Sequence, residues 1–181
     1  MPPESVDRDG LAHRFATPLA VGLGVLVADQ MTKMVVRDRL DPRDSIPLVD
    51  GFLNIVHARN PGAAFSFLAE APAWFRAPFF VAITVAAIII LLYVIGRLPA
   101  EDRLMRVALG AVLGGALGNL ADRLLYGEVT DFIDVHWHGH HWPAFNVADS
   151  SISVAVVAVV LQTAFFARPH ARTASPNGSE P

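Results

Sequence analysis

The sequence predicts an all-α membrane protein with four transmembrane helices, and three observations support that fold class. Hydrophobic residues make up 53 % of the 181 residues and charged residues only 17 %, whereas soluble proteins contain about 25 % charged residues. Several separate stretches reach the roughly 20 apolar residues that a membrane-spanning helix needs. Lys and Arg are also distributed unevenly between the segments that connect these stretches.

The apolar stretches define where the spans are expected. They cover residues 15–36, 77–96, 107–121 and 150–167. The second and fourth contain no charged residue, and the third can extend to Leu125 across Asp122 and Arg123. The first contains Asp29 and Lys33 near its end. An uncleaved span is favoured there over a secretory signal, because the preceding leader mixes acidic and basic residues and lacks a positive n-region.

The basic residues predict an orientation in the membrane. Arg97, Arg103 and Arg106 lie between the second and third spans, whereas residues 127–148 contain no Lys or Arg. Because Lys and Arg accumulate on the cytoplasmic side, we expect both termini inside and residues 127–148 outside. The arginines of residues 37–76 run against this pattern.

Three regions follow from this arrangement. Residues 1–14 and 168–181 are polar and contain Pro, a composition that cannot bury enough apolar surface to fold. We therefore expect two disordered cytoplasmic tails around a membrane domain of residues 15–167. The net charge of −3 and the lack of a basic stripe give no indication of a nucleic-acid partner.

The first external loop is expected to contain a small extracytoplasmic β-sheet. Residues 52–58 alternate in polarity and are rich in β-branched residues, which is typical of a strand. Residues 46–49 can pair with them across an Asp-Gly turn. A short interfacial helix is expected near residues 71–76, with Trp74 as its anchor.

Two features within the spans indicate how the helices pack. Asp29 and Lys33 are four residues apart, so they share a helix face and are predicted to form an ion pair. Gly110, Gly114 and Gly118 form a ridge of small residues at four-residue intervals in the third span. Such a ridge lets another helix approach closely.

The third span ends in a polar cluster of Asn119, Asp122 and Arg123. Asn119 and Arg123 lie on the same helix face, because they are four residues apart. In one interpretation, Asp122 and Arg123 neutralise each other and then orient the site without reacting.

Several carboxylates near the external end of the bundle are candidates for chemistry. They are Asp122, Asp131, Asp134 and Asp149. Helices on either side of one loop return to the same membrane depth, so two of these side chains can meet. Two adjacent carboxyl groups share one proton, and they can then act as base and acid in peptide hydrolysis. The spacing alone does not select the pair.

A group of histidines follows in the second external loop. It comprises His136, His138, His140 and His141. A metal site is one interpretation, but the spacing does not match the H-E-x-x-H pattern of zinc proteases. The interleaved tryptophans favour solvated or interfacial histidines, so we predict no metal and no cofactor. The chain has no cysteine, which excludes disulfides and thiolate ligands.

Five motifs, in the same order along the chain, resemble those of the lipoprotein signal peptidase family. They are residues 29–33 (DQMTK), 60–66 (NPGAAFS), 114–123 (GGALGNLADR), 129–135 (VTDFIDV) and 145–150 (FNVADS). Each motif is weak by itself, but five in order, at matching positions relative to the spans, are specific. The resemblance covers about residues 15–167 and leaves out both tails.

The resemblance implies roles for individual residues. Asp131 and Asp149 occupy the positions of the family's catalytic pair, whereas Asp134 occupies a position that need not be acidic. The positions that bind the substrate backbone or order the site in the family correspond here to Asn60, Asn119, Arg123 and Asn146. Asp29 and Lys33 correspond to supporting polar residues.

The resemblance also implies a function. Members of the family are intramembrane aspartic endopeptidases that remove signal peptides from diacylglyceryl-modified bacterial prolipoproteins. They cut just before the lipidated cysteine, at the outer surface of the cytoplasmic membrane. The expected partners are these substrates and membrane lipid, and the expected state is a monomer.

Two other functions are compatible with parts of the sequence. A serine protease would use Lys33 as its base and Ser66, Ser150 or Ser151 as its nucleophile. A small transporter or channel subunit would use the acidic residues within the spans as ion ligands. The chain shows no paired halves of the kind found in many transporters.

Overall fold

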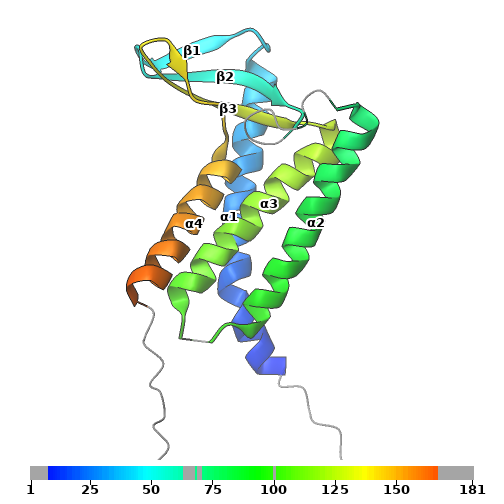
Figure 1. The fold of residues 1–181 in the computed structure, drawn as a ribbon, viewed down its shortest axis with the longest axis vertical. Helices are drawn as coiled ribbons and strands as arrows, with labels where there is room; N and C mark the ends of the chain where they lie inside the picture. The colour runs from blue at the N-terminus through cyan, green and yellow to red at the C-terminus, as the bar shows by residue number, and fades with distance from the viewer. Residues whose placement is uncertain (1–7, 63–67, 69–70, 100, 167–181) are drawn as a thin grey trace, which may run out of the picture.

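The computed structural model describes residues 8–62, 68, 71–99 and 101–166. They form a bundle of four long helices with an antiparallel sheet at one end (Figure 1). The helices are α1 (Arg8–Arg39), α2 (Ala73–Arg97), α3 (Arg103–Tyr126) and α4 (Val147–Phe166). The strands are β1 (Ser45–Val49), β2 (Leu53–Asn60), β3 (Val129–Trp137) and β4 (His140–His141).

Each helix contains a segment that is long and apolar enough to cross a membrane, which confirms the four predicted spans. Large apolar side chains face outward along the bundle; Ile89 and Val154, for example, are 61 % and 70 % exposed. Such exposure is expected where the neighbouring medium is lipid. α1 begins at Arg8, inside the segment expected to be disordered, and residues 1–7 and 167–181 lie outside the described residues.

The two ends of the bundle differ. The sheet covers one end, while α1 begins, α4 ends and α2 connects to α3 at the opposite end (Figure 1).

The predicted pairing of the first two strands is confirmed, with Ile46 opposite Ile55. The side chain of Trp74 is 78 % exposed. The residues expected as a separate interfacial helix are instead the first turn of α2, which begins directly after Pro72.

The segment between α3 and α4 contributes a strand that was not predicted from the sequence. α3 ends at Gly127, which has a positive φ of 77° and turns the chain into β3. A left-handed residue of this kind is a common helix terminator, and glycine adopts it without strain. β3 then pairs antiparallel with β2, with Asp131 opposite Ala58. The sheet therefore joins the segment between α1 and α2 to the segment between α3 and α4, and it holds β3 at the end of the bundle.

The glycine ridge of α3 packs against α1, as predicted. A Cβ atom placed on Gly110 would lie 2.6 Å from the carbonyl oxygen of Pro18, and one on Gly114 would overlap the backbone of Gly22. A Cβ on Gly118 would lie 2.5 Å from a carboxylate oxygen of Asp29. Only a residue without a side chain permits this approach, which brings the polar residues of the two helices together.

Replacing Gly114 by Ala is expected to destabilise the bundle, because the new methyl group would overlap the backbone of α1. Overpacking of this kind costs about 1–3 kcal/mol, so the thermal unfolding midpoint in detergent should fall. Gly24→Ala is the control, since a Cβ there meets no atom within 4 Å. Equal midpoints for the two variants would contradict the close packing of α1 on α3.

Candidate active site

A buried ion cluster lies beneath the sheet, between α1 and α3. The ammonium of Lys33 is 2.9 Å from Asp29 Oδ2 and 3.1 Å from Asp122 Oδ2. It also donates a hydrogen bond of 2.9 Å to Asn119 Oδ1. An ammonium has three donors, so Lys33 is fully bonded. Its side chain and both carboxylates are 0 % exposed, and the predicted pair of Asp29 and Lys33 is confirmed.

The two carboxylates of this cluster also hold the backbone of neighbouring elements. Asp29 Oδ1 accepts a hydrogen bond of 2.9 Å from the backbone N–H of Ala148, at the start of α4. Asp122 Oδ2 accepts one of 3.0 Å from the backbone N–H of Thr130, at the start of β3. One ion cluster therefore fixes where β3 and α4 begin. These two elements carry the other acidic candidates, Asp131, Asp134 and Asp149.

Asp131 lies in β3, and its side chain is bonded only to amides. Its Oδ1 accepts a hydrogen bond of 2.7 Å from Asn146 Nδ2, and its Oδ2 accepts one of 2.9 Å from Asn60 Nδ2. Asp131 is 2 % exposed. Its position follows from the sheet register, which places it beside the end of β2.

Asp149 lies in the first turn of α4, in a reciprocal cap with Asn146. The backbone N–H of Asp149 donates to Asn146 Oδ1 at 2.9 Å, and the backbone N–H of Asn146 donates to Asp149 Oδ2 at 3.3 Å. This is the geometry of a capping box, which satisfies two free donors at a helix start. Asp149 Oδ1 accepts a hydrogen bond of 2.8 Å from Asn119 Nδ2.

The two carboxylates are connected through amides. Asn146 Nδ2, which donates to Asp131, lies 3.2 Å from Asn119 Oδ1, and Asn119 in turn donates to Asp149. Amides hold a carboxylate in place without neutralising its charge. Among the described residues, Asp131 and Asp149 therefore have no bonded cation, unlike the carboxylates paired with Lys33.

Burial raises the pKa of Asp131 to about 7. The hydrogen bonds from Asn60 and Asn146 lower the pKa and the charge of Asp149 raises it, but burial has the largest effect. A buried carboxyl that lacks a cationic partner favours its neutral form. Asp131 is thus able to hold a proton close to neutral pH, as a general acid must.

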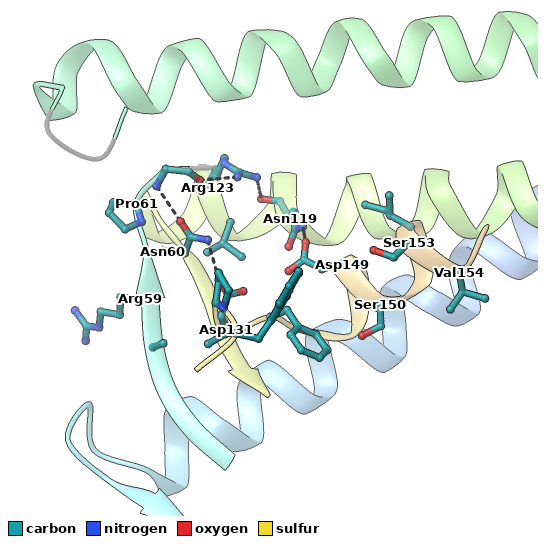
Figure 2. Close-up of a pocket in the computed structure, with 18 residues that line it drawn as sticks. Arg59, Asn60, Pro61, Asn119, Arg123, Asp131, Asp149, Ser150, Ser153 and Val154 are labelled. Carbon is teal, nitrogen blue, oxygen red and sulfur yellow. Dashed lines mark hydrogen bonds between the residues drawn. The ribbon is translucent and has the colours of Figure 1, made fainter. Parts of the chain in front are cut away.

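Both carboxylates line one cavity of about 790 Å³ (Figure 2). Its lining comes from the end of β2, from α3, β3 and α4, and from residues 142–145. The cavity lies within the usual size range of ligand sites, roughly 300–1,000 Å³. Asn60, Asn119 and Arg123 are also in its wall. The structure thus brings the implied catalytic pair and the implied binding residues to one place.

Arg123 connects α3 to the turn that follows β2. Its guanidinium donates to the carbonyl oxygens of Asn119 and Gly62, both at 3.2 Å. It also lies over the ring of Phe80, 5.4 Å from its centre. The suggested neutralisation of Asp122 by Arg123 is wrong, because the Asp122 carboxylate is bonded to cations of α1.

Asp134 is not part of this cavity. Its carboxylate accepts a hydrogen bond of 3.2 Å from Asn54 Nδ2 and lies 2.8 Å from Nδ1 of His141. Among the four acidic candidates, Asp122 is thus neutralised by cations and Asp134 is bonded elsewhere on the sheet. Asp131 and Asp149 are the two that meet at the cavity.

The sequence analysis missed two parts of this region. Arg37 donates to Asp122 Oδ1 at 3.3 Å and to Thr130 Oγ1 at 3.1 Å. A signal was present, because Arg37 follows Lys33 by four residues and so continues the polar face of α1. The second part is the cavity wall of residues 142–145, which is held by a bridge between Phe145 and Ile133. No local sequence pattern predicts that contact.

The geometry does not favour a serine protease. Lys33 is fully buried and bonded to three oxygens, so its ammonium cannot act as the base. The hydroxyl of Ser150 donates to Asn146 O, and that of Ser151 donates to Ala148 O, both at 2.8 Å. Ser66, the third candidate nucleophile, lies outside the described residues.

Comparison with known protein families gives a match over most of the chain. The model of the family described as signal peptidase (SPase) II matches residues 21–165. A lipoprotein signal peptidase of Syntrophus aciditrophicus is 47 % identical, with an alignment that covers 76 % of this chain and 85 % of that protein. A lipoprotein signal peptidase of Geobacter sulfurreducens is 48 % identical, with an alignment that covers 76 % of this chain and 84 % of that protein.

Comparison with solved structures agrees. A structure described as a bacterial membrane enzyme, determined by the in meso method at 2.3 Å resolution, superposes with a TM-score of 0.71. The two chains are 34 % identical, and the match covers 85 % of this chain and 93 % of the other.

Lys33→Met is expected to destabilise the protein strongly, because it leaves the buried Asp29 carboxylate without a cation and Asp122 with Arg37 alone. Breaking a buried ion pair in this way costs about 3–5 kcal/mol. Arg59→Met is the control, since Arg59 forms a largely exposed pair with Glu128 at 3.3 Å that is worth at most about 1 kcal/mol. The thermal unfolding midpoint in detergent measures the stability of both variants. If both variants melt like wild type, the ion cluster does not support the fold.

Proposed function

Because the chain belongs to the signal peptidase II family, we propose that Asp131 and Asp149 together hydrolyse its substrate by an aspartic mechanism. Membership of the family makes the chain a multi-pass protease of the bacterial inner membrane that removes signal peptides from prolipoproteins. The proposal concerns the reacting residues, the bond that is cut and the side of the membrane on which the site lies.

One observation carries the proposal: Asp131 and Asp149 are the acidic residues of the cavity and are held by neutral amides. The other buried acidic residues in the bundle, Asp29 and Asp122, are bonded to the Lys33 ammonium. A carboxylate bonded to a fixed cation is a poor base, because the cation stabilises its charged form. Neither carboxylate of the dyad is bonded to a cation in the part of the chain that the structure describes. This makes their charged forms costly to bury, and it also leaves them able to exchange protons.

The proposed first step is attack by a water molecule placed between the two carboxyl groups. The ionised carboxylate of the pair takes a proton from the water, and the oxygen of that water forms a bond to the carbonyl carbon of the scissile peptide. The protonated carboxyl group gives its proton to the carbonyl oxygen. The product is a neutral tetrahedral diol, and the pair still shares one proton.

The second step breaks the carbon–nitrogen bond. The carboxyl group that took the proton from water gives it to the leaving nitrogen, and the other carboxylate takes a proton back from the diol. The signal peptide leaves with a free carboxylate and the mature protein with a free amine. We propose that this amine belongs to the diacylglyceryl-modified cysteine, so the cut lies just before that residue.

The position of the cavity supports a substrate that stays in the membrane. The cavity continues from Asp149 along α4 to Ile152, Ser153 and Val154 (Figure 2), and Val154 is 70 % exposed on the surface of a spanning helix. A path from the dyad to the lipid-facing surface suits a peptide whose cysteine carries acyl chains. Membrane lipid is accordingly proposed as the medium from which substrate enters.

We place the cavity at the extracytoplasmic surface. It lies at the sheet end of the bundle, whereas Arg97 and Arg103 lie at the opposite end with the start of α1 (Figure 1). By the positive-inside rule the latter end is cytoplasmic, and so are both termini. The arginines that ran against this rule include Arg37 and Arg59, each paired with an acidic side chain.

Substrate binding is proposed for Asn60 and Arg123, which also line the cavity. The N–H of Gly62 donates to Asn60 Oδ1 at 3.1 Å, while Arg123 donates to the carbonyl oxygen of Gly62. These bonds hold the turn after β2 against α3, where it can close over a peptide backbone. Among the described residues, the dyad and the side chains bonded to it form a complete set within one chain, and we propose that the enzyme acts as a monomer.

Asp131→Asn and Asp149→Asn are each expected to lower the cleavage rate by about 10²–10⁴-fold, because an amide cannot exchange the proton. The measurement is cleavage of a diacylglyceryl-modified prolipoprotein by purified protein in lipid, with the melting midpoint as a check of folding. Asp50→Asn is the control and should keep its rate within a few-fold, since Asp50 is exposed in the turn between β1 and β2 and lies outside the cavity.

Two results would contradict the dyad. A folded Asp131→Asn or Asp149→Asn variant with a rate near that of wild type would exclude that residue from the reaction. Loss of cleavage in Ser150→Ala, with wild-type rates in both Asp variants, would restore the serine mechanism.

The cleavage rate is expected to fall as the pH rises through about 7. Burial raises the pKa of Asp131 to about 7, so the proton that the dyad shares is present below this pH and is lost above it. Two ionised carboxylates have no proton to give to the carbonyl oxygen. Single-turnover rates from about pH 5 to about pH 9 measure the effect. A rate that rises across this range in folded protein would contradict the acid role.

A further inference from the structure

A second group of ionisable side chains lies on the outer sheet, away from the cavity. It consists of Asp134 and His136 in β3 and His141 in β4, and their potential ligand atoms all lie within 4.8 Å of one another. No step of the proposed hydrolysis uses these residues. The sequence analysis favoured solvated histidines here, but it did not anticipate that β3 and β4 would pair.

The register of the hairpin brings the three side chains together. His136 lies directly opposite His141, and Asp134 precedes His136 by two residues, which puts it on the same face of β3. Nδ1 of His141 lies 2.8 Å from Asp134 Oδ1, and Nδ1 of His136 lies 3.7 Å from Asp134 Oδ2. The imidazole rings are nearly parallel, at 17°, with their centres 4.9 Å apart.

One buried ring nitrogen in this cluster lacks a hydrogen-bond partner among the described residues. It is Nδ1 of His136. Leaving a buried polar atom unpaired costs about 1–3 kcal/mol. The nitrogen lies on the same side as the Asp134 carboxylate, so an electrophile bound between them would satisfy it.

The surroundings resemble those of a metal-binding carboxylate. Asn54 Nδ2 donates to Asp134 Oδ2 at 3.2 Å and thus orients the carboxylate, as outer partners of metal ligands do. The side chains of Asp134 and His136 are only 11 % and 14 % exposed, whereas that of His141 is 56 % exposed. Two of the three side chains are therefore largely buried, and an ion can enter from the exposed side, where His141 lies.

We propose that Asp134, His136 and His141 bind one divalent transition-metal ion of the zinc class. Two imidazoles and one carboxylate suit such ions better than Mg²⁺ or Ca²⁺, which prefer oxygen ligands. Bonds of about 2.0–2.2 Å to zinc place two ligand atoms at most about 4.3 Å apart. Small rotations of the side chains close the remaining gap, and solvent completes the coordination.

Such an ion would tie β4 to β3. β4 is followed directly by residues 142–145, which form a wall of the cavity, and the N–H of Trp142 donates to Val135 O at 2.8 Å. Metal binding would thus stabilise the outer hairpin and the segment that leaves it, without contributing a ligand to the dyad.

The test is a titration of purified protein that carries no polyhistidine tag. Calorimetry with Zn²⁺, and absorption spectroscopy with Co²⁺ as a visible substitute, should show one ion per chain. Zn²⁺ should also raise the thermal midpoint, because it binds the folded state. His136→Ala and His141→Ala should each lower the affinity at least about 10-fold. His138→Ala and His140→Ala are matched controls on the same hairpin, and they should bind like wild type.

Asp134→Asn provides a third variant, because it keeps the size of the side chain and needs no change in packing. It should also weaken Zn²⁺ binding, while its midpoint without metal stays near that of wild type. Absence of saturable Zn²⁺ binding would overturn the proposal. Equal binding by His141→Ala and His140→Ala would do the same, and so would an equal rise in midpoint with Mg²⁺.

Discussion

The active end of this protein depends on a single buried ammonium group, that of Lys33. It bonds to Asp29 and Asp122 at once, with Arg37 as a second cation for Asp122, and these two carboxylates then hold N–H groups at the starts of α4 and β3. An ammonium inside a membrane bundle is tolerable only when all its donors are bonded, and Lys33 meets that condition. The glycine ridge of α3 is part of the same constraint, because it lets α1 come close enough for the ion cluster to form.

The site proposed for catalysis depends on a division between charged and neutral partners. Lys33 and Arg37 are bonded to the carboxylates beneath the sheet, and Arg123 is bonded to backbone carbonyls. The dyad carboxylates are hydrogen-bonded to the amides of Asn60, Asn119 and Asn146. This arrangement gives the dyad fixed geometry and a raised tendency to hold a proton. Placing a cation beside it would make the site more stable and chemically less useful, which is the usual conflict between stability and activity.

Sequence analysis predicted the spans and the pair of Asp29 and Lys33, because hydropathy and helical periodicity are local properties. It did not identify β3, whose pairing with β2 links segments about 70 residues apart in the chain. Without β3 the spacing could not choose between Asp131 and Asp134, which are three residues apart and have different partners. That choice came from the resemblance to a family. Arg37 was taken for a loop charge, although its spacing from Lys33 continued the polar face of α1.

The capping box of Asn146 and Asp149 makes the two halves of the dyad unequal for protein engineering. Asp149 accepts a hydrogen bond from a backbone N–H at the start of α4, so a substitution there alters the helix cap. Asp131 is bonded to the side-chain amides of Asn60 and Asn146, so an amide in its place disturbs these bonds and the one between Asn60 and the Gly62 N–H. A substrate-trapping enzyme for structural work is therefore better built by neutralising position 131, which leaves the helix start intact.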